Sequence, residues 1–280
     1  MHIRLFWRSL VRVVATISLS AILPATFAAD APSPEFISLA LREQLTRSPV
    51  EIAYIHTASG EPETVARFRY ARSRQVQFLE GKPEDSNDDR ASRIWFDADA
   101  GSSKSLYTDE NGTVKGRIDL GRRNTQLAFA DLPDPVLYNF PAGTLMDLAR
   151  SGSVSTERET INGHLCWRVE ISPTSLQHHR YVAWLDSEVG FCPRRVETYA
   201  DAGRCIVALF SSYVNLGKDV WYPTAAQWVH SKDQEVLSSA SSLVTEYALV
   251  PESRLCALDF AFPSGTEVDN LILDAVYVAP

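Results

Sequence analysis

The clearest alternation of apolar and polar residues in the chain runs from residue 164 to residue 171. Leu165, Trp167, Val169 and Ile171 alternate with His164, Cys166, Arg168 and Glu170. A period of two places successive side chains on opposite faces of a strand. The pattern therefore predicts a strand over Leu165–Ile171, with the apolar set on a core and the other set toward water.

Two further strands follow in the same stretch. Residues 181–185 are apolar almost without a break, which is typical of a central strand covered on both faces, so we expect a strand over Arg180–Asp186. Gly190 lies in the following turn and is available for a positive φ angle. Pro193 can open a third strand, Pro193–Tyr199, because its missing N–H costs little there. The segment has the pattern of the middle of a curved antiparallel sheet.

A helix is predicted before the first strands, over Glu35–Arg47. Ser33 is a capping residue, Pro34 suits the first turn, and Glu35 places an acid near the positive end of the helix dipole. Four residues then form the predicted apolar side of this helix: Phe36, Leu39, Leu41 and Leu45.

Short alternating segments separated by polar turns occupy most of the remaining chain. They predict strands over Val50–Thr57, Val65–Arg72, Gln75–Leu79, Ile94–Phe96, Ser105–Thr108, Thr113–Ile118, Ile206–Val214, Trp221–His230 and Val236–Leu249. Thr144–Arg150 is predicted as a short helix. This spacing indicates a mainly β protein with one large, mostly antiparallel sheet and a few helices, and it excludes a βαβ fold.

The first 29 residues have the features of a secretory signal peptide. Arg4, Arg8 and Arg12 form a basic region, an apolar run follows over Val13–Leu23, and small residues offer a cleavage site near Ala28. We expect cleavage, export and a single domain over residues 30–280; an uncleaved N-terminal anchor is the alternative. Removing residues 1–29 takes away three arginines and no acids, so the formal charge changes from −8 to −11. Such an acidic chain excludes nucleic acid as a partner.

Four cysteines lie after the leader, at positions 166, 192, 205 and 256. In an oxidising compartment an even number is compatible with disulfides. The predicted meander argues against a Cys166–Cys192 bridge, because a third strand separates the two. A Cys205–Cys256 bridge and four free thiols both stay open.

The sequence offers little for catalysis, and we expect no enzyme activity, no cofactor and no metal site. The serines of residues 238–242 lack a G-x-S-x-G context, and the chain has no glycine-rich phosphate loop. His56, His164 and His230 are isolated on predicted strands. A β-turn accounts for Asp186 and Glu188, so neither is assigned to an acid pair.

Several motifs in the second half of the chain resemble a known family. They are W-L-D-x-x-x-G-F-x-P-R-R-V-E from Trp184, the preceding G-x-x-C-W, V-W-Y-P-T from Val220, and F-P-S-G-T-E-V-D from Phe262. These segments resemble the periplasmic lipoprotein-carrier superfamily, which includes LolA/LolB-type lipoprotein-sorting proteins and RseB-like sensors of envelope stress. The resemblance implies an incomplete β-barrel with helices covering its concave face. It also implies an interior that receives acyl chains or serves as a protein-sensing cleft.

The apolar interior is therefore the predicted site. Acyl chains need apolar area more than hydrogen-bond donors, and ordinary core packing is the competing interpretation for each lining residue. The predicted lining residues are Leu165, Trp167, Val169, Tyr181 and Phe210. Two functions follow: a periplasmic carrier of lipid or lipoprotein acyl chains, with only transient membrane contact, or an envelope sensor or scaffold that binds another protein. No motif identifies a counterpart of the arginine that gates ligand in the carriers.

Overall fold

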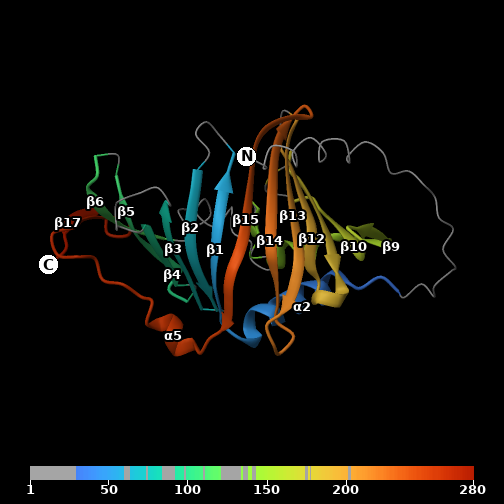
Figure 1. Cartoon of the computed structure of the whole chain (residues 1–280), viewed down its shortest axis with the longest axis horizontal. Coiled ribbons are helices and arrows are strands. Elements are labelled where there is room, and N and C mark those ends of the chain that lie inside the picture. Colours follow the sequence, from blue (N-terminus) through green and yellow to red (C-terminus); the bar gives the residue numbers. More distant parts are fainter. Residues whose placement is uncertain are drawn as a thin grey trace, which may run out of the picture. The chain divides into compact units, whose positions relative to one another are not determined.

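One large sheet, built from all but two of the described strands, dominates the fold (Figure 1). The strands are β1 (Val50–Ala58), β2 (Thr64–Arg72), β3 (Val76–Pro83), β4 (Ser92–Asp97), β5 (Ser102–Thr108), β6 (Val114–Leu120), β9 (Ser153–Ile161), β10 (His164–Ile171), β11 (Arg180–Asp186), β12 (Cys192–Ala200), β13 (Arg204–Asn215), β14 (Trp221–Lys232), β15 (Glu235–Leu249), β16 (Glu267–Asn270) and β17 (Ala275–Val278). Two short strands, β7 (Asn139–Phe140) and β8 (Gly143–Thr144), pair separately. The predicted mainly β architecture is confirmed.

This computed structural model describes residues 30–59, 64–73, 75–83, 92–97, 99–109, 111–120, 134, 138–140, 143–173, 176, 178–200 and 203–280. The predicted signal peptide lies outside the described residues and stays a prediction. Residues 31–280 form one compact unit. Of the helices that the structure describes, none is long and apolar enough to span a membrane.

The sheet consists of two antiparallel meanders, β1 to β6 and β9 to β15, which the long-range pairing of β1 with β15 joins. A second long-range pairing, of β16 with β6, adds β16 and β17 to the first meander. The strand order of the sheet is β17-β16-β6-β5-β4-β3-β2-β1-β15-β14-β13-β12-β11-β10-β9. Strand β1 pairs with β15, so Val50 lies opposite Leu249. Among the described pairs, only β16 with β6 is parallel. The described sheet is open, because β9 and β17 each have a single neighbour.

The helices are short except for α2 (Pro34–Arg47). The others are α4 (Leu145–Leu148), α5 (Glu252–Cys256) and the 3₁₀ segments η2 (Ala149–Ser151) and η3 (Ser187–Val189). Helix α2 begins as predicted, with the backbone N–H of Phe36 donating to the Ser33 hydroxyl at 3.2 Å. The predicted helix over Thr144–Arg150 divides into α4 and η2.

The predicted apolar side of α2 is partly wrong. Phe36 and Leu39 are more than half exposed, whereas Leu41 and Leu45 are buried together with Ile37, Ser38 and Gln44. The two polar residues tolerate burial because each has a backbone partner. The Ser38 hydroxyl donates to the Met146 carbonyl, and the Gln44 side-chain oxygen accepts from the Trp221 N–H.

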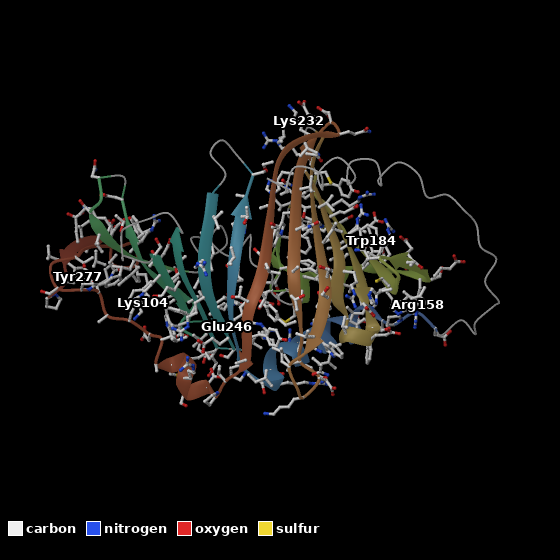
Figure 2. All side chains as sticks on the ribbon, in the orientation of Figure 1. Lys104, Arg158, Trp184, Lys232, Glu246 and Tyr277 are labelled. Atoms are coloured by element: carbon white, nitrogen blue, oxygen red, sulfur yellow. The ribbon has the colours of Figure 1, made fainter. Side chains whose placement is uncertain are left out.

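Strands β10 to β12 follow the predicted positions with one correction. All of β11 after Arg180 is buried, which confirms a strand covered on both faces. The other face of β10 was expected to meet water, but Cys166 is fully buried there. It packs with Val182 and Trp184 in a small separate cluster. Trp184 is labelled in Figure 2. Gly190 has φ +67°, which confirms its role in the turn.

All four cysteines are described, and all four are free. The Cys205–Cys256 bridge that the sequence left open is therefore not formed. Cys166 and Cys192 lie opposite the same residue, Asp186, on the two outer strands of a three-strand meander. The intervening strand keeps these two thiols apart, as the predicted meander implied.

Candidate functional site

Four of the five predicted lining residues lie in one apolar cluster on the face of the sheet that α2 covers. Trp167 and Val169 on β10, Tyr181 on β11 and Phe210 on β13 are all buried in it. Leu165 is not: it is 54% exposed and lies outside the cluster. Its predicted burial is wrong, because this face of β10 is still exposed at the start of the strand and is buried only from Trp167 onward.

Aromatic contacts fill this cluster. The Tyr181 ring stacks on Phe140 with centroids 4.2 Å apart, and Tyr138 meets Phe210 edge-on at 5.9 Å. Val169, Tyr181 and Phe210 have no accessible surface at all, so none of them borders a void large enough for a water molecule. At these positions the interior is a packed core.

Trp167 lies at the border of the cluster and has a different cover. The guanidinium of Arg158, which belongs to the edge strand β9 and is labelled in Figure 2, lies over the indole at 4.8 Å from the ring centroid. This distance is within the range of a cation–π contact. Trp167 is therefore covered on one side by a surface cation.

A buried ion pair, Arg72 with Asp134, lies on the same face of the sheet. Arg72, at the end of β2, donates from Nε to the Asp134 carboxylate at 2.5 Å, and both residues are buried. The two terminal nitrogens of Arg72, Nη1 and Nη2, are also buried and have no hydrogen-bond partner among the described residues. The Tyr222 hydroxyl on β14 is in the same situation. Donors buried without acceptors are rare and costly in folded proteins.

The electrostatics keep Arg72 charged. Burial, the largest single cause, lowers the pKa of the guanidinium, but the Asp134 carboxylate together with Tyr70 and Tyr222 more than compensates, and the net pKa is raised. Burial, with a smaller contribution from Asp134, raises the pKa of Tyr222 well above its usual value. This point of the interior therefore offers the two terminal nitrogens of a charged guanidinium, which lack a described partner, and a neutral hydroxyl to any group with oxygen acceptors.

Arg72 was not among the predicted site residues, because an arginine in a strand is most often exposed. One signal was present. Arg72 has the same parity as Phe68 and Tyr70 on β2, and Tyr70 belongs to a buried cluster with Tyr54, Leu79 and Tyr222. An arginine on the apolar face of a strand is a candidate for a buried charge.

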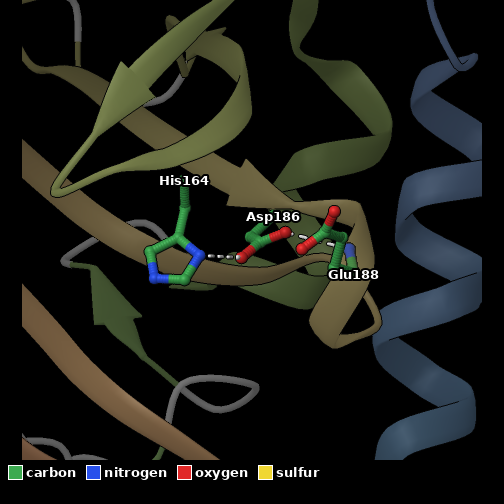
Figure 3. A group of neighbouring side chains, drawn as sticks. All are labelled: His164, Asp186 and Glu188. Atoms are coloured by element: carbon green, nitrogen blue, oxygen red, sulfur yellow. Dashed lines mark hydrogen bonds and ion pairs between the residues drawn. The ribbon is translucent and has the colours of Figure 1, made fainter.

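A second polar group consists of His164, Asp186 and Glu188, which were not predicted to lie together. His164 at the start of β10 lies 3.6 Å from Asp186, measured from Nδ1 to the carboxylate, and Glu188 follows in η3 (Figure 3). The three side chains can present ligand atoms within 4.8 Å of one another. The backbone N–H of Glu188 donates to Asp186, which confirms that Asp186 caps the predicted turn.

Arg194 decides what this group can bind. Its Nε and Nη2 atoms both donate to one oxygen of Asp186, at 2.9 and 2.8 Å, and Nη2 lies 3.4 Å from the His164 ring. A permanent cation therefore already neutralises the central carboxylate. A metal ion would have to displace Arg194, and the geometry favours a structural ion pair over a metal site.

His56 and Ser242 also come together, on the paired strands β1 and β15. Nδ1 of His56 lies 3.0 Å from the Ser242 hydroxyl. Ser242 is only 2% exposed, so its hydroxyl has no access to a substrate from solution. The pair fits an internal hydrogen bond better than a nucleophile and its base.

A surface cavity of about 530 Å³ lies apart from these groups. The tips of β4 to β6 and residues 263–266 line it, with apolar contributions from Leu106, Val114 and Pro263. Arg93 also borders the cavity, but its guanidinium is paired with Glu80 at 2.6 Å. The cavity has the size of a small-ligand pocket, and none of the described residues that line it is a buried charged group able to orient a ligand.

Comparison with known proteins identifies the fold. No family model matches the chain, and no curated protein matches it. A solved structure of a domain assigned to the outer membrane lipoprotein-sorting proteins, from Vibrio parahaemolyticus, matches with a TM-score of 0.53 and 13% identity; it covers 80% of this chain and 95% of that one. A LolA superfamily protein from Nitrosomonas europaea matches at 0.47 and 11%, covering 80% and 98%. MucB in complex with MucA(peri) matches at 0.30 and 10%, covering 80% and 59%.

The match to the Vibrio parahaemolyticus domain, with its TM-score of 0.53, supports a shared fold. The first structure aligns over nearly its whole length, so the match extends beyond a local motif. The chain therefore has the fold of the outer membrane lipoprotein-sorting proteins, as its sequence resemblance predicted.

Proposed function

We propose that this chain is a non-catalytic periplasmic binding protein that carries lipid or lipoprotein acyl chains, with Arg72 receiving the polar end of the acyl group. The basic, apolar and small-residue pattern of residues 1–29 supports export. The fold supports a carrier or scaffold role. The Arg72 guanidinium is the observation that favours the carrier.

Arg72 favours a ligand because only part of its buried guanidinium has a hydrogen-bond acceptor. Asp134 accepts one hydrogen bond, while Nη1 and Nη2 have no described acceptor and no access to solvent. Ester carbonyls, carboxylates and phosphates supply the missing acceptors, and a guanidinium binds them in pairs. An acyl ester combines this polar group with an apolar chain, which matches a buried cation surrounded by tyrosine and aliphatic side chains.

The neighbouring strands carry partly buried apolar side chains beside the cluster around Tyr70. Phe68 on β2 and Ile94 on β4 pack against the cluster around Tyr70 but are only partly buried. The Phe68 ring lies over Gly81, where a Cβ atom would approach it to 2.3 Å. We place the acyl chain along this partly covered surface, and not among Val169, Tyr181 and Phe210, where the core is filled.

Native mass spectrometry of the protein purified from its own periplasm tests the proposal, with a fluorescent fatty acid as the probe in parallel titrations. We expect copurified lipid and saturable probe binding by the wild type. Arg72→Leu should weaken probe binding at least tenfold, because a lost charge-assisted hydrogen bond costs about 1.5–3 kcal/mol. Arg93→Leu removes a paired, more exposed arginine and serves as the matched control.

A second variant separates binding from folding. Arg72→Leu leaves Asp134 buried without its partner and is expected to destabilise the protein. The double variant Arg72→Met/Asp134→Leu removes both charges and should stay folded, because replacing a buried ion pair by apolar residues is often neutral. If this folded variant binds the probe as tightly as the wild type, Arg72 is not the polar subsite. Absence of copurified lipid together with absence of probe binding would reject the carrier.

The second candidate function is an envelope sensor or scaffold that binds another protein. The filled cluster around Tyr181 favours it, since a core without voids has no space for a ligand at those positions. An exposed apolar surface on the C-terminal hairpin also favours it. A negative result in both lipid assays leaves this function as the remaining one.

A further inference from the structure

The two edges of the open sheet are protected very differently. Strand β9 presents exposed Glu157, Arg158 and Glu159 on one edge, and a bulge interrupts its pairing with β10. Charged side chains and bulges prevent an edge strand from pairing with other chains. Strand β17, the opposite edge, has the sequence Ala-Val-Tyr-Val, and all four of its residues are exposed.

An apolar surface continues from β17 into the turn before it. Val276 and Val278 are each about two-thirds exposed, and Tyr277 lies at the outer rim of the sheet (Figure 2). Leu271, Ile272 and Leu273 form the turn and are also exposed. The Asn270 side chain accepts hydrogen bonds from the N–H groups of Ile272 and Leu273, so the turn is held in this conformation.

We propose that β17 pairs with β17 of a second copy of this chain, in an antiparallel arrangement around a two-fold axis. None of the four residues of β17 carries a charge that would repel such pairing. The other edge is blocked by charge, so a head-to-tail chain of copies through β9 is disfavoured. A two-fold pair uses the same surface from both copies and closes after two.

The backbone hydrogen bonds fix the register. The Ala279 N–H donates to the Thr266 carbonyl, on the β16 side. The N–H and C=O groups of successive residues point to opposite sides of a strand, so the N–H and C=O groups of Val276 and Val278 point to the open side of β17. Opposite residues must share a face, and both valines must find partners. Val276 therefore pairs with Val278 of the second copy, and Tyr277 lies on the two-fold axis opposite Tyr277 of the second copy.

The area indicates a weak dimer. We assume that pairing covers the exposed parts of Leu271 to Leu273 and Val276 to Val278 in both copies. The two copies together then bury on the order of 1,000 Å² of accessible surface. This is the low end of specific interfaces. We therefore expect a monomer–dimer equilibrium with a dissociation constant in the micromolar range.

Sedimentation velocity of the purified protein over the micromolar to sub-millimolar range tests the equilibrium. The sedimentation coefficient of the wild type should rise with concentration from the monomer value toward the dimer value. Val276→Lys/Val278→Lys should stay monomeric throughout. Val236→Lys/Leu237→Lys changes two equally exposed apolar residues of β15 and should behave like the wild type. A wild type that stays monomeric, or a dimer that persists in the β17 variant, overturns the proposal.

Cysteine cross-linking tests the register independently, in a Cys256→Ser background that removes the exposed native thiol. On the two-fold axis, the Cα atoms of residue 277 in the two copies lie about 4.5 Å apart, which suits a disulfide. Residue 276 is about 9 Å from its own copy, beyond the reach of a disulfide. Tyr277→Cys should form a disulfide-linked dimer under mild oxidation, and Val276→Cys should not. Equal cross-linking of both variants, or none in either, contradicts this pairing.

Discussion

Gly190 provides a sensitive test of how the turn after β11 supports α2. Its φ angle of +67° is strained for any residue with a Cβ atom. A Cβ built at this position would lie 2.0 Å from Nε2 of Gln44, a residue of α2 that is 3% exposed. Gly190→Ala therefore combines backbone strain with a steric clash.

The two contributions have separate magnitudes. A left-handed conformation costs an alanine about 1–2 kcal/mol. Moving Gln44 breaks its hydrogen bond to the Trp221 N–H, which is 3.0 Å long, and leaving a donor unsatisfied costs about 1–3 kcal/mol. We expect Gly190→Ala to lower the free energy of unfolding by about 2–5 kcal/mol in total.

Gly163 is the matched control, because it isolates the backbone contribution. Its φ angle is +86°, but a Cβ there would meet no atom within 4 Å. Gly163→Ala should therefore cost only about 1–2 kcal/mol. Urea unfolding followed by circular dichroism measures both variants, and an unchanged m-value confirms that the denatured state is the same.

A double-mutant cycle completes the test. In a Gln44→Ala background the clash is absent, so Gly190→Ala should cost no more than Gly163→Ala. Equal costs of the two glycine substitutions in the wild-type background would refute the reasoning. So would a cost of Gly190→Ala that does not change when Gln44 is removed.

Three further predictions concern the core, the surface charges and the thiols. Trp167→Ala should lower the free energy of unfolding by about 3–5 kcal/mol in urea titrations if the site is packed solid, and by visibly less if the cluster can rearrange. The pKa of Glu51 is lowered, chiefly by the hydrogen bond from Arg254. The stabilisation that this carboxylate provides is therefore present above its unfolded pKa and is lost as the pH falls through its lower folded pKa. Glu51→Gln should destabilise the protein at neutral pH and have little effect in acid, as measured by thermal unfolding across pH. Burial raises the pKa of Cys166 to about 12, so Cys166 should react with Ellman's reagent only on unfolding. Cys256 is exposed and should react in the folded protein.

Periodicity predicted the strands whose burial differs strongly between faces or is complete. Strand β11 is a continuous apolar run, and α2 has a capping serine, so both were placed from local sequence alone. Strand β9 was missed because most of its residues are exposed and its sequence, SVSTERETI, has no apolar face. Strands β16 and β17 were also missed, because each is only four residues long and β16 depends on the distant β6 for its pairing.

The candidate site was harder to predict than the fold, since alternation assigns a face to a residue but not the extent of its cover. Leu165 and Trp167 share a face of β10, yet only Trp167 is covered. Arg72 depends on Asp134, which comes from a separate segment of the chain and has no sequence signal linking it to β2. Burial of a charge is a property of the tertiary arrangement, and a pattern within one strand does not encode it.

The pairing of β1 with β15 has a consequence for how the chain folds. Each meander can form from strands that are neighbours in sequence, but the contact between Val50 and Leu249 requires nearly the whole chain. Closing so long a loop has a large entropic cost before any contact compensates for it, and non-local strand pairing is slow.

We therefore expect the two meanders to form early and the seam between them to form late. Until then β1 and β15 are both unpaired edges, and the apolar residues Ile52 and Val244 on either side of the seam stay open to water. The slowest step of folding is thus also the step with the greatest exposure to aggregation. Substitutions that weaken the seam should slow refolding more than equally destabilising substitutions within either meander.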